Sequence, residues 1–130
     1  MTVVDANVVA DAIRATGGPA DQALSQAVPP LAVPELLDLE VTSAYRKLVA
    51  AGMLTPAEGR ELLDRLRALP IDRHRHAPLL PRIWELRAIM SVYNAAYAAL
   101  AEQLGAILLT RDAMFTTAPG LRCPVQLVAD

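Results

Sequence analysis

Residues 90–112 read MSVYNAAYAALAEQLGAILLTRD and combine a helix with a buried strand. Ser91 is a typical helix N-cap, and Gly105 is a typical residue to end the helix that follows. The run after Gly105 is apolar and continuous up to Thr110, and an acid, Asp112, lies two residues further on. A continuous apolar strand next to a helix is typical of a parallel sheet that is covered on both faces. This stretch therefore predicts an α/β fold.

The rest of the chain repeats the alternation of short strands and helices. Asn7 is interpreted as the N-cap of a first helix, and Thr55 with Glu58 forms a capping box. Strands are expected at 2–4, 31–33, 70–75, 106–112 and 123–130. Further helices are expected at 20–27, 35–51, 55–69, 77–90 and 91–104. The pattern predicts a three-layer α/β/α sandwich around a small parallel sheet.

Length and composition predict one globular domain over residues 1–130. Apolar residues make up 54% of the 130 residues and charged residues 20%, with a formal net charge of −2. The one cysteine, Cys123, excludes an internal disulfide and a cysteine-rich metal site. The sequence shows neither a membrane span nor the pattern of a signal peptide, so we expect a cytoplasmic protein without a membrane partner.

Four oxygen-bearing side chains are expected at one edge of the sheet. Asp5 and Asp112 follow two strands, Glu40 lies early in the helix after the second strand, and Asn94 lies in the first turn after Ser91. Ligands in parallel sheets bind beyond the carboxyl ends of the strands, where these residues should meet.

Three carboxylates close together are unfavourable without a counter-charge. A divalent cation provides one, and oxygen ligands suit Mg²⁺ or Mn²⁺ better than Zn²⁺. Each residue alone also has a simpler interpretation: Asp5 or Asp112 as a turn former or cap, Glu40 as an arginine partner, and Asn94 as a cap of its own helix. The combination at one edge favours a metal site.

Several segments resemble a known family. The stretches VVDANVVADAI, LEVTSAYRKL and MSVYNAAYAALAEQLGAILLTRD, together with the distances between them, are similar to PIN-domain ribonucleases, specifically VapC toxins of toxin–antitoxin pairs. The resemblance covers almost the whole chain and is most specific over residues 90–112. It implies an α/β/α sandwich and an endoribonuclease that hydrolyses RNA with Mg²⁺ or Mn²⁺. It also implies a VapB-like antitoxin as partner, and a homodimer.

The family's acids fall on Asp5, Glu40 and Asp112, and its third acid falls on Asn94, where the sequence departs from the usual Asp. The resemblance implies that these four residues hold the metal, with Thr110 contacting the metal shell. Asn7 is expected beside them. Asn94 lowers the charge of the site, so weaker binding of a divalent cation is expected. A natural protein of weak activity and an engineered change both explain it.

Arginines near this edge are candidates for contacting RNA, with Arg111 and Arg87 preferred and Arg73, Arg75 and Arg82 as weaker candidates. His74 and His76 are interpreted as surface residues. The apolar strip of the helix at 55–69, comprising Leu62, Leu63, Leu66 and Leu69, is expected either to bind the antitoxin or to pack in the core. The alternative function is a catalytically silent PIN module that acts by binding the antitoxin.

Overall fold

The computed structural model describes residues 1–129 and shows a five-stranded sheet in the order β3-β2-β1-β4-β5. All neighbouring strands are parallel, and β1 lies at the centre with Val3 paired to Ala32 of β2 and Leu108 of β4. The strands are β1 (Thr2–Val4), β2 (Leu31–Pro34), β3 (Ile71–His74), β4 (Ile107–Thr110) and β5 (Val125–Leu127). Asp130, at the end of the expected last strand, lies outside the described residues.

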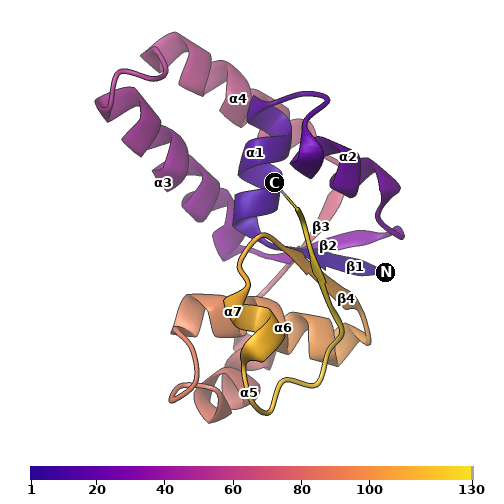
Figure 1. The fold of residues 1–130 in the computed structure, drawn as a ribbon. Coiled ribbons are helices and arrows are strands. Elements are labelled where there is room, and N and C mark those ends of the chain that lie inside the picture. The colour runs from indigo at the N-terminus through magenta and orange to yellow at the C-terminus, as the bar shows by residue number, and fades with distance from the viewer. Residues whose placement is uncertain (130) are drawn as a thin grey trace.

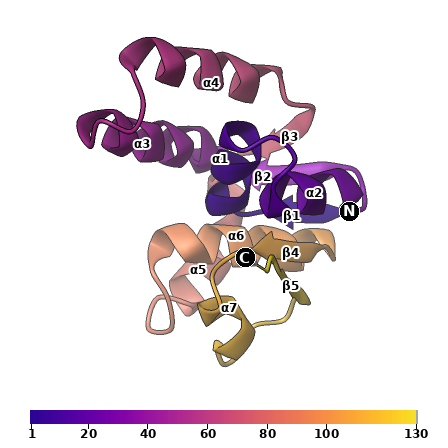
Figure 2. The ribbon, with the colours of Figure 1, turned by 45° about the horizontal axis from the view of Figure 1, so that its top comes forward.

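Helices cover both faces of the sheet. Figures 1 and 2 show α1 to α4 on one side and α5 to α7 on the other. The first group is α1 (Ala6–Arg14), α2 (Pro19–Gln26), α3 (Leu36–Ala50) and α4 (Pro56–Ala68). The second group is the 3₁₀ turn η1 (Ala77–Leu79), α5 (Leu80–Glu85), α6 (Val92–Leu104) and α7 (Met114–Thr117). The predicted three-layer α/β/α sandwich is confirmed.

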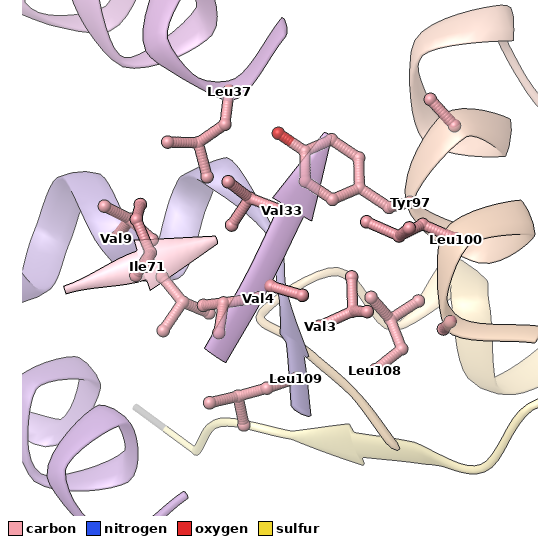
Figure 3. Close-up of a cluster of buried hydrophobic side chains, with 14 of the residues drawn as sticks. Val3, Val4, Val9, Val33, Leu37, Ile71, Tyr97, Leu100, Leu108 and Leu109 are labelled. Carbon is pink, nitrogen blue, oxygen red and sulfur yellow. The ribbon is translucent and has the colours of Figure 1, made fainter. Parts of the chain in front are cut away.

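The core explains why the central strands β1 and β4 read as apolar runs. Side chains of β1 and β4 are buried on both faces, as Val3, Val4, Leu108 and Leu109 illustrate in Figure 3. A parallel sheet between two helical layers has no solvent-facing side, so both sets of alternating side chains are apolar. Within residues 1–129, no helix is long and apolar enough to cross a membrane.

Two local predictions were wrong. The N-cap of α1 is Asp5 rather than Asn7, because the Asp5 side chain accepts a hydrogen bond from the Ala6 amide. The helix expected at 77–90 is broken into η1 and the six-residue α5. Pro78 and Pro81 account for the break, since proline has no amide hydrogen to donate and suits only the first turn of a helix.

Two other features differ in detail. His76 is not simply a surface residue, because its Nε2 atom accepts a hydrogen bond of 3.0 Å from the amide of Leu36 at the start of α3. The apolar strip of α4 packs mainly in the core, where Leu62 and Leu66 are buried, while Leu63 borders the groove between α3 and α4 and Leu69 borders a smaller hollow beside α1 and α2. The capping box at Thr55 and the left-handed glycine that ends α6, Gly105, are confirmed.

Candidate functional site

Asp5 is a buried carboxylate at the carboxyl end of the central strand. Its side chain is only 6% exposed, although charged side chains are rarely buried without a partner. Oδ1 accepts a hydrogen bond of 2.8 Å from the Ala6 amide, and Oδ2 accepts one of 2.7 Å from the Thr110 hydroxyl. Both oxygens are therefore fixed by strand ends and by the start of α1.

Thr110 connects Asp5 with Asp112. The Thr110 side chain is fully buried, and its oxygen also accepts a hydrogen bond of 3.0 Å from the Asp112 amide. Asp112 in turn accepts a hydrogen bond of 2.9 Å at Oδ1 from the Met114 amide. One hydroxyl thus holds the segment after β4 against the carboxylate that follows β1.

Glu40 approaches the same edge from the second turn of α3. Its Oε1 accepts a hydrogen bond of 2.7 Å from the hydroxyl of Tyr97, which lies on α6. Figure 3 shows the Tyr97 ring among the core side chains, with its oxygen directed toward Leu37 of α3. Tyr97 is fully buried, so its only polar atom is placed where it meets this carboxylate.

Asn94 lies on α6 one turn before Tyr97. Residues three apart on a helix share a face, so Asn94 is presented to the side on which Tyr97 meets Glu40. The backbone amide of Asn94 donates a hydrogen bond of 3.1 Å to the Ser91 hydroxyl, which completes the N-cap of α6. The capping role expected as the simpler interpretation therefore belongs to Ser91, and no hydrogen bond within residues 1–129 joins the Asn94 side chain to the acids.

The charges of the acids act on one another. Burial raises the pKa of Asp5, and the nearby charge of Asp112 raises it further, although the hydrogen bonds from Thr110 and Ala6 lower it. Burial also raises the pKa of Glu40, against the opposing hydrogen bond from Tyr97, and the charge of Asp5 adds to the increase. Asp5 is therefore the carboxylate that couples the other two.

The donor set fits a hard divalent cation. Glu40 Oε2 and Asp112 Oδ2 accept no hydrogen bond from residues 1–129, so both are available to a cation. All the candidate metal-ligand atoms are oxygens. No three Asp, Glu, His or Cys side chains in this range form a group that could hold a metal ion, so the acids do not present a closed ligand set. Mg²⁺ does not require one, because it usually keeps several waters and binds through one or two carboxylates.

Four of the five arginines expected to contact RNA have side-chain partners among residues 1–129, and Arg75 has none there. The Arg111 guanidinium pairs with Asp11, while its amide donates to Asn7 Oδ1 at 3.2 Å, so Asn7 holds the loop beside Asp5. Arg87 lies over the Trp84 ring, 4.5 Å from the centroid. Arg73 pairs with Asp38, and Arg82 pairs with Glu102.

Sequence reasoning missed Tyr97 as a site residue. The apolar periodicity of residues 93–104 places Tyr97 on the buried stripe but does not distinguish tyrosine from phenylalanine. The available signal is the hydroxyl itself, because a buried tyrosine usually has a hydrogen-bond partner. Glu40, set among apolar neighbours on α3, is the matching acceptor.

Comparisons with known proteins agree with the fold described above. The family model described as PIN domain matches residues 2–121. VapC ribonuclease Mb0985 of Mycobacterium bovis is 38% identical over 98% of both chains, and ribonuclease VapC1 of Mycobacterium tuberculosis is 37% identical over 97% of this chain and 96% of its own. A toxin–antitoxin complex from Klebsiella pneumoniae contains a chain with a TM-score of 0.76 and 20% identity, covering 100% of this chain and 99% of that one. VapBC2 from Rickettsia felis, bound to a promoter DNA fragment, gives a TM-score of 0.73 and 16% identity, with 96% and 98% covered.

Proposed function

Because this chain belongs to the PIN-domain family and resembles its VapC ribonucleases over nearly its full length, we propose that it is the toxin of a type II toxin–antitoxin pair. Its activity in this proposal is endonucleolytic hydrolysis of RNA. The relatives named VapC ribonuclease support the reaction, and the acids at the carboxyl edge of the sheet support its location. The cation it uses is Mg²⁺ or Mn²⁺.

The observation that carries the proposal is the burial of Asp5 beside two further carboxylates. Keeping an ionised group in this position costs free energy, as the raised pKa of Asp5 shows. Such an arrangement persists where a function requires the charge. A bound cation lowers this cost because it favours the ionised form of each ligand.

In this proposal Asp5, Glu40, Asp112 and the neutral Asn94 side-chain oxygen would hold the cation partly through water, because no three of the acids within residues 1–129 form a closed ligand group. When bound, the ion supplies Lewis acidity at the phosphodiester and makes water a better nucleophile. The chain itself orients the ligands: Thr110 fixes Asp5, Tyr97 fixes Glu40, and the Met114 amide fixes Asp112. Pre-oriented ligands lose less conformational entropy on binding.

The proposed partner is a VapB-like antitoxin. Its docking place is the groove between α3 and α4, of about 290 Å³, which the side chains of Tyr45, Val49, Pro56 and Leu63 make largely apolar. From there a C-terminal segment of the antitoxin would reach the acids. The expected homodimer remains a prediction, and the exposed Trp84 of α5 and Tyr93 of α6 belong to the later helices that it would use.

Cleavage of RNA by the Asn94→Asp variant tests the enzymatic proposal. Restoring a carboxylate should strengthen the cation site, so we expect this variant to cut single-stranded RNA faster than the chain as it stands, by about tenfold or more. Cleavage should require Mg²⁺ or Mn²⁺ and stop with a chelator. Asp5→Asn in the same background is the inactive control, and the enzymatic proposal is wrong if Asn94→Asp cuts no RNA with either ion.

A catalytically silent PIN module is the second candidate. Asn94 favours it, because an amide oxygen contributes no charge to the cation site. Such a module would keep the α3–α4 groove for its protein partner. It predicts that Mn²⁺ binds weakly even after Asn94→Asp. Calorimetric Mn²⁺ titration measures this directly, whereas a lack of cleavage alone could also mean that the wrong RNA was supplied.

A further inference from the structure

A second groove runs along the other side of α3, between α3 and α1. This α1–α3 groove encloses about 450 Å³ and has one of the site acids, Glu40, in its wall. Its lining comprises residues 10, 11 and 14 of α1 and residues 40, 43, 44, 45, 47 and 48 of α3. Neither the sequence patterns nor the family relationship singles out its two basic residues, Arg14 and Lys47.

The charges in the α1–α3 groove favour an anionic ligand. Arg14 and Lys47 are exposed, and neither forms an ion pair with any residue from 1 to 129. Asp11, the acid on the α1 wall, is already paired with Arg111. Away from Glu40, the groove therefore presents two cations whose charge no acid of the described chain neutralises.

The spacing along α3 suits a chain of phosphates. Glu40 and Lys47 are seven residues apart, which places them on one face of the helix at about 10 Å along its axis. Ser43 lies between them and adds a hydroxyl donor. A linear polyanion that lies along Lys47 and Arg14 would thus meet Glu40 at its next positions.

We propose that the α1–α3 groove binds the phosphate backbone of a single-stranded RNA, with Arg14 and Lys47 contacting phosphates beside the bond that is cut. This rests on the proposed function, since the acids define which bond is cut. The two sides of α3 then serve different ligands. The polar side toward α1 takes the nucleic acid, and the apolar side toward α4 takes the protein partner.

The test compares Lys47→Glu with Arg46→Glu. Both residues are exposed neighbours on α3, but Arg46 lines the α3–α4 groove and Lys47 the α1–α3 groove, so the two variants change net charge equally in two different grooves. Affinity for a fluorescently labelled single-stranded RNA of mixed sequence is measured with a chelator present, by anisotropy. We expect Lys47→Glu to weaken binding about tenfold or more and Arg46→Glu to change it less than threefold.

Salt dependence separates phosphate contacts from other effects. Phosphate contacts on a single strand each contribute about 0.7 to the log–log slope of affinity against salt, so Arg14→Glu with Lys47→Glu should reduce the slope by about 1.4. Equal losses in Lys47→Glu and Arg46→Glu overturn the proposal, because general charge then explains them. Unchanged RNA affinity in Lys47→Glu also overturns it and leaves the groove to a protein partner. Cleavage plays no part in this measurement, so its outcome is independent of the cleavage assay.

Discussion

Tyr97 is a residue whose environment changes how the site is understood. An apolar side chain would fill its place in the core, yet the chain buries a hydroxyl there and directs it to Glu40. A carboxylate at the edge of a groove would otherwise adopt several rotamers. The hydrogen bond from Tyr97 selects one of these rotamers. In this rotamer Glu40 is close enough to Asp5 for the charge of Asp5 to raise the pKa of Glu40.

Tyr97→Phe should weaken cation binding more than its cost in stability explains. Removing a hydrogen bond to a charged group costs about 1 to 3 kcal/mol, and here part of that loss falls on the geometry of the site. Tyr45→Phe is a matched control, because Tyr45 is equally buried and donates at 2.8 Å to the Ala10 carbonyl rather than to an acid. Mn²⁺ titration should show reduced affinity in Tyr97→Phe alone. Equal affinity in the two variants would show that Tyr97 is merely a core residue.

The site could be predicted from the sequence only where chain position determines it. Asp5 and Asp112 follow strands, and the carboxyl ends of parallel strands meet at one edge whatever the details of packing. The bond between Tyr97 and Glu40 joins residues 57 positions apart on two helices in different layers. Periodicity specifies which face of a helix is buried, but it carries no information about which polar atom on another helix that face meets.

Among the elements, α5, α6 and the loop before β5 are joined by one ion pair. Arg82 donates to both carboxylate oxygens of Glu102 at 2.6 and 3.2 Å, and the Arg122 amide donates to Glu102 at 2.7 Å. The Glu102 side chain is 10% exposed, so the pair is shielded from solvent more than a surface pair. It fastens the short α5 to the helix that carries Asn94 and Tyr97.

The contribution of Glu102 should depend on pH. Burial alone raises the pKa of Glu102, but the bonds from Arg82 and Arg122 outweigh it, so its pKa lies below the usual range. A carboxyl with a lowered pKa stabilises the fold above the pKa of the unfolded chain, and this stability is lost as pH falls through the lowered value. Urea unfolding should show Glu102→Gln less stable by about 1 to 2 kcal/mol at pH 7.

The difference between Glu102→Gln and the unchanged chain should begin to shrink as pH falls below about 4.3, the ordinary pKa of Glu in an unfolded chain, and should reach its minimum only once pH lies below the lowered pKa of the folded state. Glu85→Gln is a suitable control, because Glu85 meets Arg82 at 3.5 Å on an exposed surface. A difference for Glu102→Gln that stays constant down to the acid limit would contradict an ionic origin.

Elements were predictable where local chemistry dominates. The capping box at Thr55 and the glycine after α6 are local signals, and both were correct. The length of α5 was not predictable from its apolar pattern. Two prolines restrict where a helix can begin, and the helix ends at Leu86, whose amide donates hydrogen bonds to carbonyls of the preceding turn. The N-cap at Asp5 was missed because Asp5 and Asn7 are both good caps, and only the end of β1 decides between them.

For the whole molecule, the parallel sheet is what concentrates negative charge at one edge. Three adjacent strands, β2, β1 and β4, end there, and each is followed by a segment that carries one of the acids. Asn94, in the first turn of α6, is predicted to lie at the same edge. A fold of this kind brings distant residues together without any local sequence signal. The strand pattern and the family resemblance nevertheless both predicted that the acids lie at this edge of the sheet.

Calorimetric titration of Mn²⁺ into this chain, Asn94→Asp and Asp5→Asn measures whether the carboxylates after these strands form a divalent-cation site. We expect measurable binding to the chain as it stands, binding about tenfold or more tighter in Asn94→Asp, and loss of binding in Asp5→Asn. Equal affinities in all three proteins, or no binding even in Asn94→Asp, would contradict this expectation.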